Sequence, residues 1–121
     1  MSLRPRFYIA LASAFIAIGA HVIADRFFLY WTVPQIDIPI HMLGGIMAGL
    51  FSGVALMAAG KSQTWRAIVL GSLIVGIGWE LLEVVMHSVD TMRWWYPYDT
   101  VKDLIDDMIG GTIAYLIWKK L

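Results

Sequence analysis

Carboxylate and imidazole side chains recur at helical spacing within apolar stretches of the chain. Glu80 and Glu83 are three residues apart, His87 follows Glu83 by four, and Asp37 and His41 are four apart. Because an α-helix turns about 100° per residue, each set lies on one helical face. Carboxylates with imidazole can bind a divalent cation or move protons. These spacings therefore indicate a polar site supplied by more than one helix.

The first and last apolar stretches carry stripes of the same kind. Their members are His21 and Asp25 in the first stretch, and Asp99, Asp103, Asp106 and Asp107 in the last. At a rise of about 1.5 Å per residue, the stripes reach one layer roughly 6–10 Å inside the outer helix ends. A charged residue at a helix centre in lipid costs about 2.5–3.5 kcal/mol. We therefore expect the carboxylates to face the interior of a helix bundle.

Few positive charges are available to neutralise this layer. Only Arg26, Arg93 and Lys102 lie at the same end of the predicted helices. We therefore expect a bound divalent metal ion (Mg²⁺, Mn²⁺, Ca²⁺ or Zn²⁺) or protonated carboxylates. The candidate metal ligands are His41, Glu80, Glu83, Asp103, Asp106 and Asp107. The candidate catalytic groups are Glu80, Glu83 and Asp107, which would support metal-assisted hydrolysis of a lipid or envelope substrate.

Other interpretations of the same residues stay open. Glu80 and Glu83 alone fit a helix end that reaches water, and Asp103 and Asp107 alone fit a helix N-terminus stabilised by acids. A histidine such as His41 can be an interhelical hydrogen-bonding residue. The cluster also fits a cation or proton conduit, or an assembly subunit that pairs with basic residues of a partner. Whether the protein is an enzyme stays open.

The elements that carry these residues are predicted to be membrane-spanning helices. Hydrophobic residues make up 60% of the 121 residues and charged residues 15%, against about 45–50% and 25% in soluble domains. Four apolar segments are long enough to cross a bilayer as helices, which needs roughly 20 residues each: 7–29, 38–60, 65–87 and 101–118. We expect one all-α domain over residues 1–121, an antiparallel four-helix bundle. A cleaved signal peptide is the alternative for the first segment.

Basic residues predict the orientation. Six lie on one side of the predicted spans (Arg4, Arg6, Lys61, Arg66, Lys119 and Lys120), against three on the other. Both termini are therefore expected in the cytoplasm. The net charge is zero and there is no cysteine, so nucleic-acid binding, disulfides and thiolate metal sites are not expected.

Two further features concern packing and the membrane boundary. Gly45, Gly49 and Gly53 repeat every four residues, a spacing that allows helices to approach closely. We expect this contact inside the bundle, and a homodimer interface is the alternative. The link 88–100 is rich in tryptophan and tyrosine, which is typical of an interfacial anchor. The alternative is a lid over the polar site.

Three short motifs occur in a recognisable order. They are His41-Met-Leu-Gly-Gly45, Trp79-Glu-Leu-Leu-Glu83 and Asp99-Thr-Val-Lys-Asp103-Leu-Ile-Asp-Asp107-Met-Ile-Gly110-Gly111. Over about residues 37–111 the chain resembles the small YjdF-type and VanZ-like bacterial membrane proteins. The acidic Glu83 and Asp107 depart from the glutamine and asparagine usual in VanZ-like proteins and favour the YjdF-type comparison. The resemblance implies a multi-pass bacterial inner-membrane protein with a polar intramembrane site.

Overall fold

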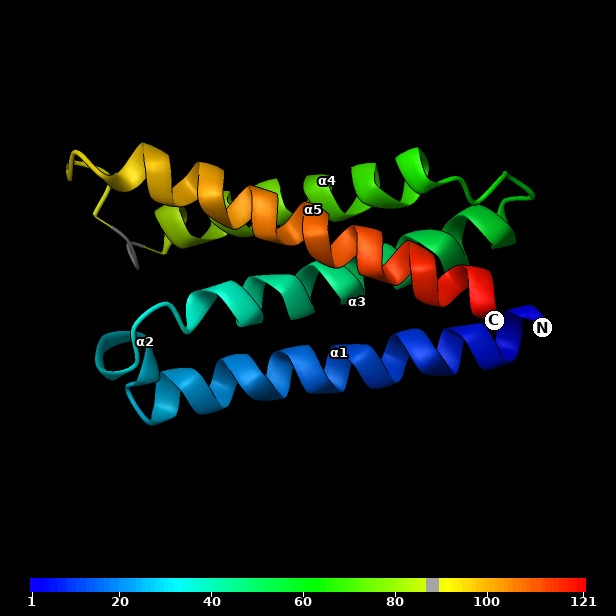
Figure 1. Ribbon diagram of the computed structural model, residues 1–121, viewed down its shortest axis with the longest axis horizontal. Helices are drawn as coiled ribbons and strands as arrows, with labels where there is room; N and C mark the ends of the chain where they lie inside the picture. The colour runs from blue at the N-terminus through cyan, green and yellow to red at the C-terminus, as the bar shows by residue number, and fades with distance from the viewer. Residues whose placement is uncertain (87–89) are drawn as a thin grey trace.

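The computed structural model describes residues 1–86 and 90–121, and long helices dominate it (Figure 1). The helices are α1 (Leu3–Arg26), α2 (Leu29–Thr32), α3 (Asp37–Ala58), α4 (Trp65–Val85) and α5 (Tyr96–Lys120). No strand occurs in these described residues. The predicted all-α class is confirmed.

Local sequence signals set the turn between α3 and α4. Gly60 adopts a positive φ of 66°, and the Lys61 N–H donates to the Leu56 carbonyl at 2.8 Å. This left-handed glycine and backward hydrogen bond end α3 as a Schellman motif. At the start of α4, the Thr64 hydroxyl accepts from the Ala67 N–H at 3.2 Å, which caps the helix.

Two predicted boundaries were wrong. The first helix ends at Arg26 rather than near 29, because Phe28 takes a left-handed conformation (φ 55°) and the chain turns into the short α2. Helix α5 begins at Tyr96 rather than near 101, because Pro97 lies in its first turn, where a missing N–H costs no helical hydrogen bond. His87, the expected end of the third helix, lies outside the described residues.

The expected count of four spans is supported for three helices. Within the described residues, α1, α3 and α4 are long and apolar enough to cross a membrane by length and composition. Helix α5 has 25 residues but is not among them. The reason lies in its first half, which carries five charged residues: Asp99, Lys102, Asp103, Asp106 and Asp107.

Helix α3 is the centre of the bundle. It packs most extensively against α5 and also contacts α1 and α4, and both chain termini lie at the same end (Figure 1). A Cβ atom added to Gly49 would lie 2.6 Å from the Ala114 Cβ, and one added to Gly53 would lie 2.7 Å from the Trp118 ring. The prediction that these glycines allow close packing inside the bundle is confirmed.

Gly49→Ala is expected to lower the free energy of unfolding by about 1–3 kcal/mol, because its methyl group would overlap Ala114 on α5. Gly78→Ala on α4 is the matched control, because nothing lies within 4 Å of its added Cβ. The control should gain up to about 1 kcal/mol from helix propensity. Equilibrium unfolding in mixed micelles measures both, and equal effects would contradict this packing.

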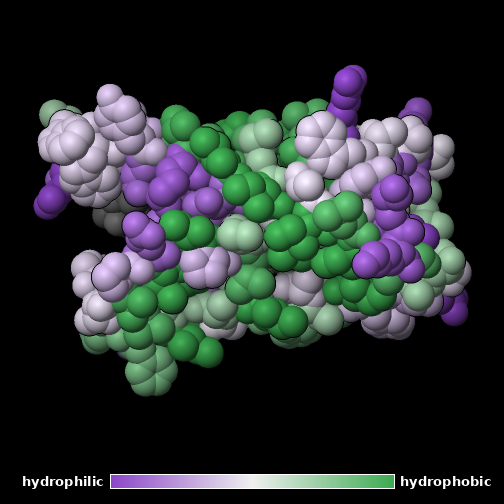
Figure 2. All heavy atoms as spheres, in the orientation of Figure 1, coloured by the Kyte–Doolittle hydropathy of each residue, from purple (hydrophilic) through white to green (hydrophobic). Residues whose placement is uncertain are grey.

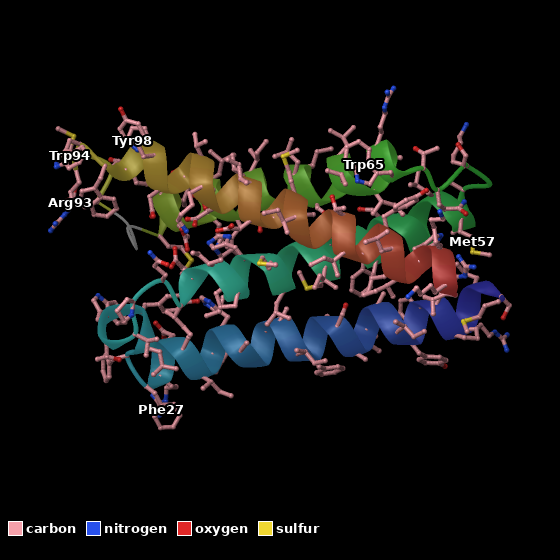
Figure 3. The ribbon with its side chains drawn as sticks, viewed as in Figure 1. Phe27, Met57, Trp65, Arg93, Trp94 and Tyr98 are labelled. Carbon is pink, nitrogen blue, oxygen red and sulfur yellow. The ribbon has the colours of Figure 1, made fainter. Side chains whose placement is uncertain are left out.

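Apolar side chains cover the middle of the bundle and hydrophilic ones gather at its ends (Figure 2). Figure 3 places Arg93, Trp94 and Tyr98 at the end of the bundle that holds Phe27, opposite Met57. The side chains of Trp94 and Tyr98 are largely exposed, which fits an interfacial anchor. Neither of them lines the cavity described below, whereas Asp99 of the same predicted link does.

Candidate metal centre

The site begins with His41, whose imidazole lies between α3 and α5. Its Nε2 is 3.5 Å from Asp103 Oδ2, and its Nδ1 is 3.3 Å from Asp107 Oδ1. The helices come this close because both surfaces carry glycine here. A Cβ on Gly45 would collide with the Asp107 backbone, and one on Gly110 would collide with the backbone of α3. The glycines therefore bring the two acids of α5 within reach of His41.

Helix α4 adds Glu80 to this pair of helices. One ligand atom from each of His41, Glu80 and Asp103 lies within 4.8 Å of the other two. Glu80 and Asp103 are buried, and Glu80 Oε2 accepts a hydrogen bond from the Thr100 hydroxyl at 3.2 Å. Three helices thus bring one imidazole nitrogen and two carboxylate oxygens close together.

Two carboxylate oxygens at this site have unmet hydrogen-bonding capacity. Glu80 Oε1 and Asp107 Oδ2 are buried and have no hydrogen-bond partner among the described residues. Their residues are only 7% and 4% exposed. A buried acceptor without a partner costs about 1–3 kcal/mol, and more when it is charged. Such atoms call for a group such as an ion or a water molecule.

Lys102 supplies positive charge beside the centre. Its Nζ is 2.6 Å from Asp37 Oδ2 and Asp103 Oδ1, and 3.4 Å from Asp106 Oδ2. Ligand atoms of Asp37, Asp99 and Asp103 form a second group within 4.8 Å. One ammonium group therefore serves three carboxylates, while Glu80 and Asp107 lie outside its contacts.

The predicted ligands occupy different positions around the centre. His41, Glu80 and Asp103 meet, whereas Asp107 contacts the opposite nitrogen of His41. Asp106 faces Lys102. Glu83 Oε1 accepts a hydrogen bond from Trp79 Nε1 at 3.0 Å and is not part of either three-ligand group found in the described chain.

Sequence reasoning missed the roles of Thr100 and Lys102 at the centre. Thr100 is the fifth residue of α5 and donates to Glu80, whereas the sequence predicts a link at this position. The position of Lys102 four residues before Asp106 is the signal that could have predicted their ion pair. The pairs of Lys102 with Asp37 and Asp103 have no such signal in the spacing.

A cavity of about 660 Å³ adjoins the centre. It reaches His41, Asp103 and Asp107 at one end and apolar side chains of α1 and α4 elsewhere. Other polar residues that line it are His21, Asp25, Tyr30, Asp37, Ser72, Glu83 and Asp99. The volume lies within the range of small-molecule sites, about 300–1,000 Å³.

Tyr30 in α2 reports the electrostatics of this cavity. Burial raises the pKa of its phenol to about 12, and the negative charges of Glu83 and Asp25 act in the same direction. Its hydroxyl lies 2.7 Å from His21 Nδ1. Burial and the neighbouring carboxylates thus both favour the neutral phenol of Tyr30.

A comparison with known protein families assigns the chain to a family of membrane proteins. The model of the family described as "Predicted membrane protein (DUF2238)" matches residues 1–121. The chain belongs to this family. No curated protein and no solved structure matches this DUF2238 chain. The match supports a family of small membrane proteins, and the resemblance to YjdF-type and VanZ-like proteins stays an expectation.

The residues of this DUF2238 protein fit a divalent cation. Ligands bound at about 2.0–2.2 Å to one ion in tetrahedral geometry lie about 3.5 Å apart, so the group within 4.8 Å would contract by up to about 1.3 Å on binding. With Nδ1–H of His41 donating to Asp107, Nε2 presents its lone pair towards Asp103. A carboxylate on the far nitrogen is the usual support of a metal-binding histidine.

Proposed function

We propose that the protein binds one divalent cation inside the membrane, through His41 Nε2 and the carboxylates of Glu80 and Asp103. The supporting observation is the convergence of these ligand atoms, from three helices, within 4.8 Å. Glu80 Oε1 is buried and has no hydrogen-bond partner in the described residues, so this oxygen is available to bind a cation. A cation would occupy that acceptor and offset the negative charge of the layer.

The donor set favours Zn²⁺ or Mn²⁺. Imidazole suits Zn²⁺, and carboxylates suit Mn²⁺, Mg²⁺ and Ca²⁺. One nitrogen with two carboxylates combines the two preferences. Asp107 is then a positioning residue, because it fixes the tautomer and orientation of His41.

Chelation is the experiment that tests the cation. A ligand at a hundredfold excess over its dissociation constant stabilises the folded state by about 2.7 kcal/mol. We expect a chelator to lower the melting temperature by roughly 10 °C, and Zn²⁺ or Mn²⁺ to restore it. A melting temperature that changes neither with chelator nor with added ions would contradict the proposal.

We further propose that all four long helices cross a bacterial inner membrane, with both termini in the cytoplasm. The acids of α5 support this, because Asp103, Asp106 and Asp107 are buried within the bundle rather than exposed to lipid. The six basic residues at the end with the termini favour the cytoplasm, and the YjdF-type resemblance favours a bacterial inner membrane.

Cysteine labelling in intact cells tests this orientation. A cysteine at Gln63, in the α3–α4 turn, should react with an impermeant reagent only after the membrane is opened. A cysteine at Met92, whose residue is 91% exposed, should react from outside. The reverse pattern would overturn the orientation, and labelling of both from one side would overturn the four spans.

The cavity favours a second, catalytic function: metal-assisted hydrolysis of a lipid or envelope substrate. The observation that supports this function is that two of the proposed ligands, His41 and Asp103, line the cavity together with Glu83. A bound cation would lower the pKa of a coordinated water, and Glu83 would accept its proton. A conduit has less support, because Leu50, Ile68 and Trp118 form an apolar core towards the other end.

A further inference from the structure

The cavity beside the centre has an apolar side that opens towards lipid. Helix α1 packs on α3, and α4 packs on α3 and α5. Side chains of both α1 and α4 line the cavity. Ile18, Leu82 and Met86 line the cavity and are also 58%, 45% and 68% exposed. Residues that both line a cavity and reach the surface mark its mouth. A molecule in the surrounding bilayer therefore has lateral access to the cavity.

Carboxylates outnumber the other charged groups on the polar side of the cavity. Asp25, Asp37, Glu83 and Asp99 line it, no lysine or arginine of the described chain does, and Lys102 pairs with Asp37 from outside the lining. Asp107 also lines the cavity and is 4% exposed, and its Oδ2 is buried without a hydrogen-bond partner among the described residues. Charge complementarity favours a cationic group, because an anionic head would lie beside several carboxylates.

Aromatic rings also line the cavity. His21 contacts Trp79 edge-on, with ring centroids 5.1 Å apart, and Tyr30 contacts Trp31 with centroids 6.3 Å apart. All four rings line the same cavity. An ammonium group within about 6 Å of such rings gains cation–π attraction, as in cages that bind alkylated amines.

We propose that this cavity binds an amphiphile with a long apolar chain and a cationic amine head. The head lies between the aromatic rings and the carboxylates of Asp25 and Glu83, and the chain follows Ile18 and Leu82 towards the lipid. The cavity volume of about 660 Å³ accommodates the head and the first part of such a chain. This ligand does not depend on the proposed divalent cation.

The experiment uses three photoreactive probes with one identical long chain: a primary amine, an alcohol and a carboxylic acid. Each is added to the chelator-treated full chain in phosphatidylcholine nanodiscs, and the cross-linked residues are mapped by mass spectrometry. We expect the amine to label the lining residues of α1 and α4 at least about tenfold more than the alcohol or the acid. Equal labelling by amine and alcohol, or preference for the acid, would overturn the proposal.

Two variants separate binding from general partition into the membrane. Asp25→Asn combined with Glu83→Gln should lower amine labelling about tenfold, whereas the exposed Asp90→Asn should leave it unchanged. Ile18→Trp, which fills the mouth and keeps every charge, should also lower it. Helix content by circular dichroism confirms folding of each variant. If neither cavity variant lowers amine labelling, the proposal is wrong.

Discussion

Glu80→Gln is expected to raise the dissociation constant for Zn²⁺ or Mn²⁺ by about 100-fold or more. The substitution keeps the size of the side chain but removes one of two charged ligands that converge on His41. Loss of a supporting outer carboxylate costs about 10–100-fold in metal affinity, and loss of a direct ligand costs at least as much. Titration calorimetry on chelator-treated protein in nanodiscs measures the change.

The stability of the metal-free Glu80→Gln variant should not fall along with its metal affinity. Without metal, Glu80→Gln removes one carboxylate from a crowded acidic layer and should not lower the melting temperature. Asp107→Asn should lower metal affinity by about 10–100-fold, since it acts through His41. Asp90→Asn, on the exposed Asp90–Arg93 pair, should bind metal as the parent chain does. Equal affinity in Glu80→Gln and Asp90→Asn would contradict the ligand assignment.

Lys102→Met is expected to lower the free energy of unfolding by about 2 kcal/mol. Its ammonium contacts three carboxylates, two of them at 2.6 Å. Breaking a buried ion pair costs about 3–5 kcal/mol. The smaller figure follows because the Lys102 side chain is 38% exposed, and water screens its charge. Equilibrium unfolding in mixed micelles, in chelator, measures the loss.

A double variant tests whether the loss comes from these carboxylates. Lys102→Met combined with Asp106→Asn should cost less than the sum of the two single changes, because the double variant leaves one fewer unpaired acid. Lys61→Met, in the exposed α3–α4 turn, is the matched control and should stay within about 0.5 kcal/mol of the parent. Additive effects at positions 102 and 106 would contradict this charge network.

Apolar length and helical spacing predict most of the fold. The spans at α1, α3 and α4 follow from uninterrupted hydrophobic runs, and the glycines every four residues mark the surface that α5 covers. The short α2 could not be predicted, because it depends on the left-handed backbone of Phe28. The early start of α5 was predictable from Pro97 and Asp99, which are typical of a first helical turn.

The site was only partly predictable, because spacing places residues on a helix without placing helices on each other. Successive residues differ by about 100°, so Asp106 and Asp107 point to different neighbours: Lys102 and His41. Glu80 and Glu83 differ by about 60°, and only Glu80 joins the three-ligand group. Which member of each pair faces His41 depends on the contact between α3, α4 and α5. That contact cannot be read from one sequence.

Anomalous diffraction from crystals grown without chelator, in added Zn²⁺ or Mn²⁺, tests the cation site most directly. The proposed site predicts one peak at the absorption edge of the metal, at bonding distance from His41 Nε2 and from carboxylate oxygens of Glu80 and Asp103. A Glu80→Gln crystal should lack the peak. An ordered site without a peak at this position, or a peak held by other residues, would contradict the proposed function.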